Sequence, residues 1–557
     1  MAAGFGFSFA GFFIKAVGPA VGGVEVMKRR ILFFYGLLGI GILLLLGRLF
    51  ELQIIFGSQN RQIAEGNRIR RVIDLAPRGI IFDRHQQPLV RNVPIYRLAS
   101  GDEKWEVISR EEALKIEIKS GEQAEKLRVD MGREYLYGQS LAHLLGYLSE
   151  AGPEEVGSGD SQLGDLVGRT GLEEEYEEIL RGTNGGEVFE VDSQGQKIRE
   201  VGKVTSVAGE DIYLSVDAEL SRVAFEALIE FGEGKPGAVV VTEAKTGQVL
   251  ALVSFPSFNP NKITDKDLTD TKKPFFNRAI SGVYPPGSTF KIVTAAAGVE
   301  EGKVSRDTLY EDKGFIQVGD YIYKNWLFSK RGMAEGKINV VYALKRSTDT
   351  FFYKVGEWVG ANRLAVWAKA FGLGKKTGID LPFESEGLVP SPEWKEKTTG
   401  ERWFLGNTYH FAIGQADLLV TPLQINMMTS VIANDGKLCQ PRVAKSTSGS
   451  SEVKDCQDLQ LKNETLELIK EGLTQACSSG GTAWPLFGFQ PQVACKTGTA
   501  EFAPSASSGQ VRTHAWLTAY APADNPEIVV TAVVEAGGEG SDIAAPIVKK
   551  VLEHYFH

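Results

Sequence analysis

An uncharged run of residues lies near the N-terminus, from Ile31 to Gly47. It constrains the fold more than any other feature, because as a helix it would span roughly 26 Å, close to the hydrocarbon thickness of a bilayer. A cleaved signal peptide or a buried helix can give a similar run. The run is long for the apolar part of a signal peptide, however, and no cleavage site of small residues follows it. We therefore expect a single transmembrane anchor over residues 28–50.

Basic residues flank the run on both sides, so charge bias alone is inconclusive about its orientation. Lys28, Arg29 and Arg30 precede it and favour a cytoplasmic N-terminus, but several arginines follow its other end. The expected orientation, with residues 1–27 as a cytoplasmic tail and the large domains outside the cell, depends more on the chemistry described below. Residues 1–26 are rich in Gly and Phe, and Met27 opens an ordinary membrane-protein start, so we hypothesise that translation begins at Met27.

Length and composition are those of a globular protein with several folding units. The chain has 557 residues, of which 43% are hydrophobic and 24% charged, and this length predicts two to four units. A formal net charge of −9 gives no basic surface for nucleic acid, and we exclude that class of partner.

The cysteines point to neither a zinc site nor a disulfide scaffold. There are four of them and no pair has the C-x-x-C spacing, so we expect no metal and no cofactor. Cys439 and Cys456 flank a serine-rich segment. A disulfide between them and two unpaired thiols both remain open.

The pattern of expected strands and helices changes along the chain. From Arg68 to about Asp217, short alternating stretches are punctuated by Gly, with one helix expected at Gly171 to Leu180. A helix from Ala218 to Phe231 then begins a second region, in which strands are followed by helices and then by strands again. This region ends with an amphipathic helix from Ile543 to Phe556, which we expect to pack on the sheet. This order predicts an α/β (α+β) fold with a mostly antiparallel sheet flanked by helices. The expected parts are an elongated, mixed α/β pedestal at residues 51–215 and a larger domain at residues 216–557.

A possible nucleophile lies in Ser288-Thr-Phe-Lys291, which follows a Pro-Pro-Gly turn and opens an apolar run. A serine and a lysine three residues apart on a helix share one face, so the amine can reach the hydroxyl and deprotonate it. This role requires burial and a second cation to disfavour the charge of Lys291, and the sequence offers Lys496 as that cation. Alone, S-x-x-K is a weak pattern that more often marks a surface serine beside a lysine.

Two companion motifs make the pattern specific. Ser347-Thr-Asp349 follows Lys291, and Lys496-Thr-Gly-Thr499 lies near the end of the chain. Serine acyltransferases of the penicillin-recognising kind use these motifs in this order.

The third motif is expected on a strand, where side chains alternate between two faces. Thr497 and Thr499 then share one face, and Lys496 points to the other. The two hydroxyls can bind the C-terminal carboxylate of a peptide, and Gly498 leaves room for the acyl substrate. The backbone N–H groups of Thr499 and Ser288 can point at a developing oxyanion.

At these motifs the chain resembles the class B penicillin-binding proteins, and more narrowly the penicillin-binding protein 2 group of the elongation machinery. The resemblance extends from about Arg68 to Tyr555. It implies a serine-type D-Ala-D-Ala transpeptidase that cross-links peptidoglycan during cell-wall elongation and is inhibited by β-lactams. The further matching stretches are Arg78-Gly-Ile-Ile-Phe-Asp-Arg84, Gly168-Arg-Thr-Gly-Leu-Glu173, Ser254-Phe-Pro-Ser-Phe-Asn-Pro-Asn261, Ile413-Gly-Gln415 and Thr421-Pro-Leu-Gln424.

The resemblance also implies a role for each motif residue. Ser288 would attack the penultimate D-Ala carbonyl of a stem peptide, with Lys291 as the base. Ser347 would relay a proton toward the leaving group, helped by Lys496. Asp349 stands where most relatives carry asparagine, and an aspartate here resembles the elongation-type rather than the division-type enzymes.

The expected partners follow from the same resemblance. They are peptidoglycan stem peptides on a lipid-linked glycan, β-lactams and the membrane. A RodA-type glycosyltransferase of the elongation complex would contact the membrane helix and the pedestal.

Several features depart from the family pattern. Residues 93–135 look shorter than the head of typical relatives. Asn407 stands where an aspartate is frequent, Ala416 where glycine is usual, and Cys495 where a glycine commonly precedes the lysine of the third motif.

Other functions remain as alternatives. A D,D-carboxypeptidase or a β-lactamase shares the nucleophile and the base but transfers the acyl group to water. We find no E-x-x-L-N element between Ser347 and Lys496 that would position such a water. A catalytically silent scaffold or β-lactam sensor that regulates a glycosyltransferase is the other alternative, and the intact motif residues argue against it.

Overall fold

The computed structural model describes residues 23–58, 69–100, 104–119, 126–152, 165–192, 197–445, 456–502 and 512–557. The chain forms two compact units, one of residues 1–74 with 185–205 and one of residues 75–184 with 206–557. The hypothesis of a start at Met27 concerns residues 1–26, of which 1–22 lie outside the described part. The expected domain boundary near residue 216 stays a prediction.

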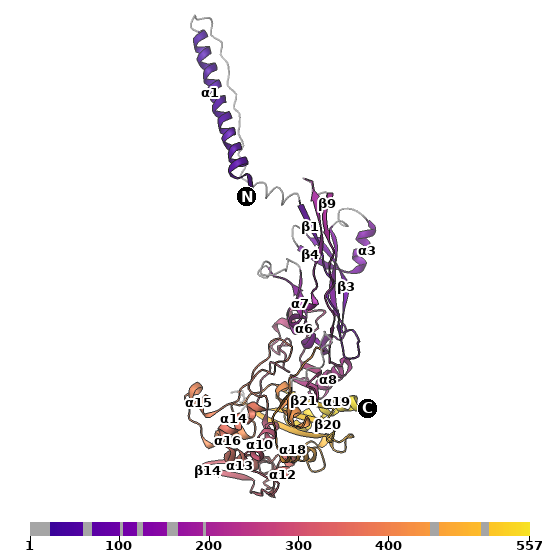
Figure 1. Cartoon of the computed structure of the whole chain (residues 1–557), viewed down its shortest axis with the longest axis vertical. Helices are drawn as coiled ribbons and strands as arrows, with labels where there is room; N and C mark the ends of the chain where they lie inside the picture. Colours follow the sequence, from indigo (N-terminus) through magenta and orange to yellow (C-terminus); the bar gives the residue numbers. More distant parts are fainter. Residues whose placement is uncertain are drawn as a thin grey trace. The chain divides into compact units, whose positions relative to one another are not determined.

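The first unit contains the apolar helix α1 (Gly23–Phe50), drawn in indigo in Figure 1. With the π-helical turn that follows it (Glu51–Ile55), α1 provides a segment of 27 residues, Arg29–Ile55, which contains an 18-residue stretch with a mean hydropathy of 2.1. This length is sufficient to cross a hydrocarbon core of about 30 Å. The same unit holds an antiparallel sheet of β1 (Ile69–Asp74), β8 (Gly185–Val191) and β9 (Lys197–Val204).

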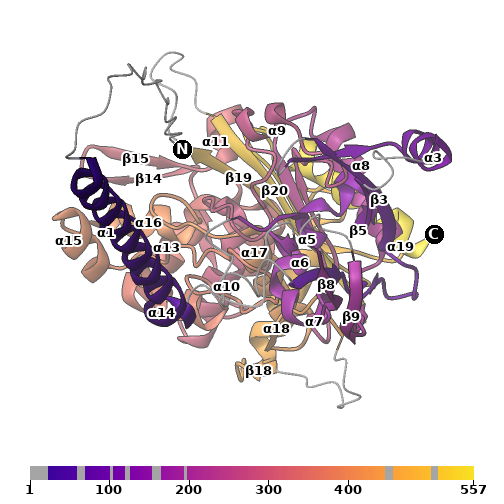
Figure 2. The ribbon, with the colours of Figure 1, turned by 90° about the horizontal axis from the view of Figure 1, so that it is seen from above.

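The second unit is built around a five-stranded antiparallel sheet with the strand order β12-β11-β21-β20-β19. Strand β19 forms one edge, beside β20 (Figure 2). One side of the β19 backbone therefore faces away from the sheet. The predicted fold class, a mostly antiparallel sheet flanked by helices, is confirmed. The strands are β11 (Gly237–Glu243), β12 (Val249–Phe255), β19 (Ala494–Phe502), β20 (Arg512–Ala521) and β21 (Ile528–Val534).

Helices α8 (Ala218–Phe231) and α19 (Ala545–Phe556) pack together on one face of this sheet. Helix α8 begins at the predicted residue because the Asp217 side chain accepts from the Leu220 N–H at 3.0 Å and caps the helix. Helix α19 begins later than the predicted Ile543, after a π-helical turn (Gly540–Ala544). A proline, which fits only the first turn of a helix, marks this start. The predicted packing of α19 on the sheet is confirmed, since its apolar face is buried there.

The opposite face of the sheet is covered by α17 (Pro422–Ala433), whose residues are all buried. Side-chain hydrogen bonds join it to the strands: Thr429 Oγ1 lies 2.8 Å from Thr518 Oγ1, and the Asn426 amide donates to the Val240 carbonyl at 3.1 Å. Helix α10 (Lys291–Glu300), the apolar run predicted after Ser288, lies in the same core.

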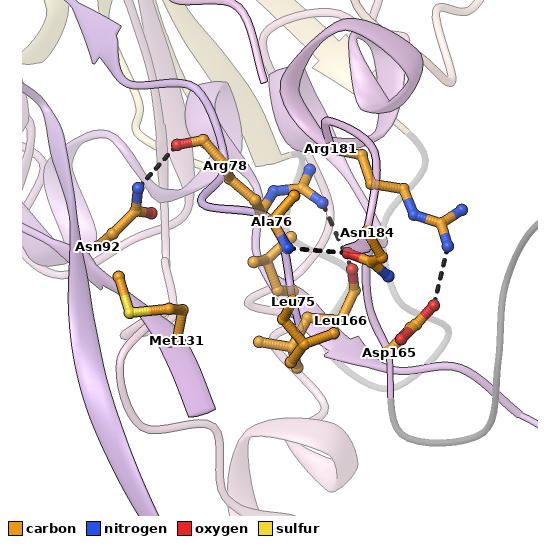
Figure 3. Close-up of a pocket in the computed structure, with 11 residues that line it drawn as sticks. Leu75, Ala76, Arg78, Asn92, Met131, Asp165, Leu166, Arg181 and Asn184 are labelled. Carbon is orange, nitrogen blue, oxygen red and sulfur yellow. Dashed lines mark hydrogen bonds and ion pairs between the residues drawn. The ribbon is translucent and has the colours of Figure 1, made fainter. Parts of the chain in front are cut away.

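Two of the matching sequence motifs meet at a buried ion cluster in the second unit. Glu173, which is fully buried, accepts from the guanidinium groups of Arg78 at 2.9 Å and Arg133 at 2.7 Å. A cavity of about 40 Å³ borders Arg78, and Figure 3 shows the Asn92 amide pointing toward the Arg78 carbonyl. Removing one partner of such a cluster would leave a buried, uncompensated charge. The cluster therefore ties together three segments that are distant in the sequence.

The helical stretch predicted from Gly171 to Leu180 begins and ends at the predicted residues, but it is not a single helix. The structure has two short helices, α6 (Gly171–Glu175) and α7 (Glu177–Leu180). They are separated at Tyr176, whose backbone has φ −109° and ψ 24° and whose hydroxyl donates to Asp380 at 2.8 Å. This contact joins residues 204 positions apart, and helical periodicity in the sequence does not reveal it.

The four cysteines form two disulfides. Cys439 and Cys456, whose pairing the sequence leaves open, join strands β17 (Lys437–Cys439) and β18 (Cys456–Asp458). The second bond, between Cys477 and Cys495, was not predicted. It links the end of α18 (Asn463–Ala476) to strand β19.

Candidate active site

Ser288 lies in a short 3₁₀ turn (Gly287–Phe290) that leads directly into α10. The turn is held on two sides. The Gly287 N–H donates to the Gly414 carbonyl at 2.8 Å, and the Trp516 indole donates to the Pro285 carbonyl at 3.1 Å. Gly287 has a φ of +55°, a conformation that favours glycine. The turn places the Ser288 side chain, which is partly exposed, in the wall of a cleft.

Gly498 allows this turn to lie directly against strand β19. A Cβ atom on Gly498 would lie 2.9 Å from the Pro286 carbonyl oxygen and 3.0 Å from Cγ2 of Thr289. These distances are too short for a real side chain. The close approach of the turn that carries Ser288, the nucleophile turn (Gly287–Phe290), therefore requires glycine at position 498. The predicted role of Gly498, leaving room for an acyl substrate, stays a prediction beside this packing role.

Lys291 is fully buried at the start of α10, and its ammonium group has three acceptors. Nζ donates to the Asp349 carboxylate at 2.6 Å, to the Ser347 carbonyl at 2.8 Å and to the Ser347 hydroxyl at 3.2 Å. Within the described residues the Ser288 hydroxyl makes no hydrogen bond, so the expected contact between Ser288 and Lys291 is not made. Such contacts often form only in the complex with substrate.

Ser347 joins α12 (Val340–Arg346) to α13 (Asp349–Val359). Its φ of +58° lies in the left-handed region, which costs a residue with a side chain roughly 1–2 kcal/mol. This conformation turns both the carbonyl and the hydroxyl of Ser347 toward Lys291. Asp349 is the first residue of α13, and its second carboxylate oxygen accepts from the Trp326 N–H at 3.2 Å.

Lys496 approaches the same serine from strand β19. Its Nζ atom is fully buried and donates to the Ser347 hydroxyl at 2.8 Å and to the Thr497 carbonyl at 3.0 Å. The Ser347 hydroxyl therefore lies between two amines. The structure thus brings the three sequence motifs together at one place.

Burial and neighbouring charges shift the pKa values of both buried amines. Burial lowers the pKa of both Lys291 and Lys496, because the charged forms are removed from water, while Asp349 acts against this effect on both. The charge of Lys291 lowers the pKa of Lys496 further, to well below its ordinary value. The sequence predicted that the charge of Lys496 would lower the pKa of Lys291. In the structure the charge of Lys291 lowers the pKa of Lys496 instead, while Lys291 has the Asp349 carboxylate at 2.6 Å.

Strand β19 directs the backbone of Thr499 toward the cleft. The Thr499 carbonyl accepts from the Gln415 side chain at 3.4 Å. It also lies close to the turn that carries Ser288, because a Cβ atom on Gly287 would lie 2.9 Å from the Thr499 carbonyl oxygen. In an antiparallel strand, the N–H and C=O of one residue point to the same side. The Thr499 N–H therefore points away from β20, the direction that an oxyanion donor needs.

The cleft beside Ser288 has a volume of about 1140 Å³. Ser347, Thr497 and Thr499 line it with Ser288, so predicted residues from all three motifs share one cleft. A space of this size is enough for peptide segments. Among the described residues, no three His, Cys, Asp or Glu side chains are placed to hold a metal ion.

The sequence did not predict two residues of the cleft, Thr482 and Glu539. Thr482 Oγ1 lies 2.8 Å from Thr497 Oγ1. Glu539 accepts from Thr499 Oγ1 at 3.1 Å and from Lys330 Nζ at 2.7 Å. Both lie on loops, and no spacing pattern in the sequence connects them with the motifs.

Two of the positions that depart from the family pattern have clear structural surroundings. Ala416, where glycine is usual, has a φ of +60° and lines the cleft, which explains why a glycine suits this position. The Asn407 side chain accepts from the Phe404 N–H at 2.8 Å at the start of α16 (Leu405–Ala412).

Comparisons with known proteins agree with this site. The penicillin-binding protein transpeptidase domain family matches residues 237–553, and the penicillin-binding protein dimerisation domain family matches residues 103–214. The chain is 33% identical to the peptidoglycan D,D-transpeptidase MrdA of Acinetobacter baumannii, over 95% of this chain and 88% of that protein. It is 32% identical to MrdA of Escherichia coli K12, over 92% of each chain.

Solved structures give the same result. One similar chain comes from a structure of a peptidoglycan synthase complex that coordinates polymerization and crosslinking. It has a TM-score of 0.76 and 29% identity to this chain, and the match covers 96% of this chain and 99% of that one. Penicillin-binding protein 2 of Helicobacter pylori, solved in complex with MreC, has a TM-score of 0.73 and 27% identity, covering 87% and 98%.

The edge strand of an antiparallel sheet and the neighbouring helices surround Ser288, beside a buried arrangement of Lys291, Ser347 and Lys496. These features define a serine acyltransferase of the penicillin-recognising fold. The chain belongs to the class B penicillin-binding proteins, in the penicillin-binding protein 2 group. It is a membrane-anchored peptidoglycan D,D-transpeptidase of cell-wall synthesis.

Proposed function

We propose that this transpeptidase works through an acyl-enzyme on Ser288 during cell-wall elongation, and that β-lactams inhibit it by acylating the same hydroxyl. One observation carries the proposal. Lys291, Ser347 and Lys496 form a continuous buried chain of hydrogen bonds beside the cleft that Ser288 lines. Burial lowers the pKa of both amines in this chain, the direction that a base for a serine requires.

The reaction has two halves. In the first, the Ser288 oxygen bonds to the penultimate D-Ala carbonyl carbon and its proton passes to Lys291. The bond to the nitrogen of the terminal D-Ala breaks, and that nitrogen takes a proton through Ser347. In the second, the amine of a neighbouring stem peptide attacks the ester and loses a proton, and the Ser288 oxygen leaves and regains one.

Lys291 must be neutral to act as the base, and Lys496, whose pKa is lowered by burial and by the charge of Lys291, can take its proton. Ser347 supplies the route between them, because its hydroxyl is 3.2 Å from one amine and 2.8 Å from the other. Lys291 gives a proton to the Ser347 oxygen while the Ser347 O–H proton passes to Lys496. A substrate carboxylate near Thr497 raises the pKa of Lys496 and so favours this transfer.

Further parts of the proposal concern place and partners. Two disulfides in the second unit suit an oxidising compartment and so support a cytoplasmic N-terminus with residues 216–557 outside the cell. The similar structures of a complex with MreC and of a peptidoglycan synthase complex support a RodA-type glycosyltransferase and the elongation complex as partners. We place the contact surface on the membrane helix and on a pedestal of residues 51–215.

The alternatives are weaker. A silent scaffold would not need the left-handed Ser347 or two buried amines, both of which destabilise the folded state. A carboxypeptidase or β-lactamase would hydrolyse the acyl-enzyme, and product analysis separates these outcomes from transpeptidation.

The experiment is incubation of the full-length protein with a lipid-linked glycan polymer that bears pentapeptides. Cross-linked dimers with release of D-Ala support the proposal, and Ser288→Ala should give none. Release of D-Ala without dimers would indicate a carboxypeptidase. No change in the glycan, with protein that still melts cooperatively, would favour the scaffold.

A further inference from the structure

A short segment after α18, residues 478–483, forms a wall of the cleft beside strand β19. The Thr482 N–H donates to the Ala476 carbonyl at 3.1 Å, and the Arg346 guanidinium donates to the Gly480 carbonyl at 3.0 Å. Cys477, directly before the segment, is bonded to Cys495, directly before Lys496. The segment is therefore covalently attached to the strand that carries the third motif.

This attachment places one hydroxyl of the segment next to a hydroxyl of the motif. Thr482 Oγ1 lies 2.8 Å from Thr497 Oγ1, and both residues line the cleft together with Ser288. The two hydroxyls have two O–H protons, and the bond between them uses one. Within the described part of the chain neither hydroxyl has another partner, so one proton is available to a ligand that accepts hydrogen bonds.

The hydroxyl of Thr499 is less available. It already donates to Glu539 at 3.1 Å, and Lys330 holds this carboxylate in place at 2.7 Å. A ligand carboxylate that took the Thr499 proton would have to displace Glu539 and would meet its negative charge. The pair of Thr497 and Thr499 is therefore not a complete carboxylate site by itself.

The charges near Thr482 favour an anion. The ammonium group of Lys496 donates to the Thr497 carbonyl at 3.0 Å, so a cation lies under this end of the strand when Lys496 is protonated. The carboxylate of Glu539 lies at the Thr499 end, two residues further along the strand.

From these contacts we propose that Thr482 is a substrate-binding residue that donates, with Thr497, to the terminal carboxylate of the donor stem peptide, and that the Cys477–Cys495 disulfide holds it there. This inference deepens the proposed function and rests on it. It adds to the carboxylate site a residue outside the three motifs.

The experiment measures acylation of the full-length protein by two peptide thioester donors that differ only at the terminus. One ends in a free carboxylate and the other in its methyl ester. In the wild type the carboxylate donor should have the higher kcat/KM. Thr482→Val should lower this preference about tenfold, because a hydrogen bond to a charged group is lost, whereas Thr482→Ser should keep it.

The preference ratio separates binding of the carboxylate from a general loss of structure, which would lower both rates equally. An unchanged ratio in Thr482→Val, or an equal fall for both donors, would overturn the role of Thr482. Wild-type protein that takes no label from fluorescent penicillin would contradict the proposed function itself.

The disulfide has its own comparison. Replacing Cys477 and Cys495 together by serine should lower the preference ratio. Replacing Cys439 and Cys456 in the same way provides a matched control, since that bond joins β17 to β18 and neither cysteine lines the cleft. An equal ratio in the two double variants would contradict the positioning role of the Cys477–Cys495 bond.

Discussion

The ammonium group of Lys291 lies 2.6 Å from the carboxylate of Asp349, in a site where the lysine is fully buried. The carboxylate stabilises the protonated amine that burial destabilises. It therefore sets how readily Lys291 becomes the free base. An asparagine at this position would keep the size of the side chain and remove the charge.

Asp349→Asn should accordingly lower the pKa of Lys291 further, because only burial would then act strongly on the amine. The acidic limb of the pH profile for acylation by penicillin should shift to lower pH, since the neutral amine persists there. The profile is measured as the second-order acylation rate constant over a range of pH. A limb that stays in place or moves to higher pH would show that Asp349 does not control the base.

A second prediction concerns Gly498. In Gly498→Ala the new Cβ would lie 2.9 Å from the Pro286 carbonyl and 2.9 Å from Cβ of Trp516, so the nucleophile turn must move. A displacement of about 1 Å is expected to lower the acylation rate roughly 100-fold. Stopped-flow acylation measures the rate. Gly202→Ala is the matched control, because its Cβ would have nothing within 4 Å; an equal loss in both variants would contradict the packing role of Gly498.

A third prediction concerns stability at mildly acidic pH. His143 is buried with Nε2 2.7 Å from the Pro274 carbonyl, and burial lowers its pKa from 6.5 to about 4. The unfolded chain therefore binds the proton more tightly than the folded one. The stability that the neutral ring contributes is complete above about pH 6.5 and is lost as the pH falls toward 4.

The free energy of unfolding should thus decrease between pH 7 and pH 5, with about 2 kcal/mol of the decrease due to His143. His514 shows the same shift, to a pKa of about 4, and should contribute a further part. Chemical unfolding of His143→Gln at both pH values tests this, because the variant should lose stability less steeply. A slope equal to that of the wild type would contradict the assignment.

The sequence predicts the fold where local patterns decide it. Short apolar runs mark β11, β12, β20 and β21, and Asp217 marks the start of α8 through its capping hydrogen bond. The motifs that meet in the cleft were recognisable because their residue types and order are specific. These features depend on short stretches of sequence.

Other features depend on contacts between distant segments and were out of reach. The break at Tyr176 coincides with its bond to Asp380, and the Cys477–Cys495 pair depends on where α18 ends beside β19. Lys291 also has the 2.6 Å contact with Asp349, which no spacing in the sequence reveals.

The most direct test of the central claim is to locate the covalent adduct. The full-length protein is treated with penicillin, digested, and its peptides are analysed by mass spectrometry, with Lys291→Ala and Lys496→Ala treated in parallel. The account predicts an adduct on the Ser288 peptide in the wild type and little or none in either lysine variant. An adduct on another residue, or full labelling of Ser288 in the lysine variants, would contradict it.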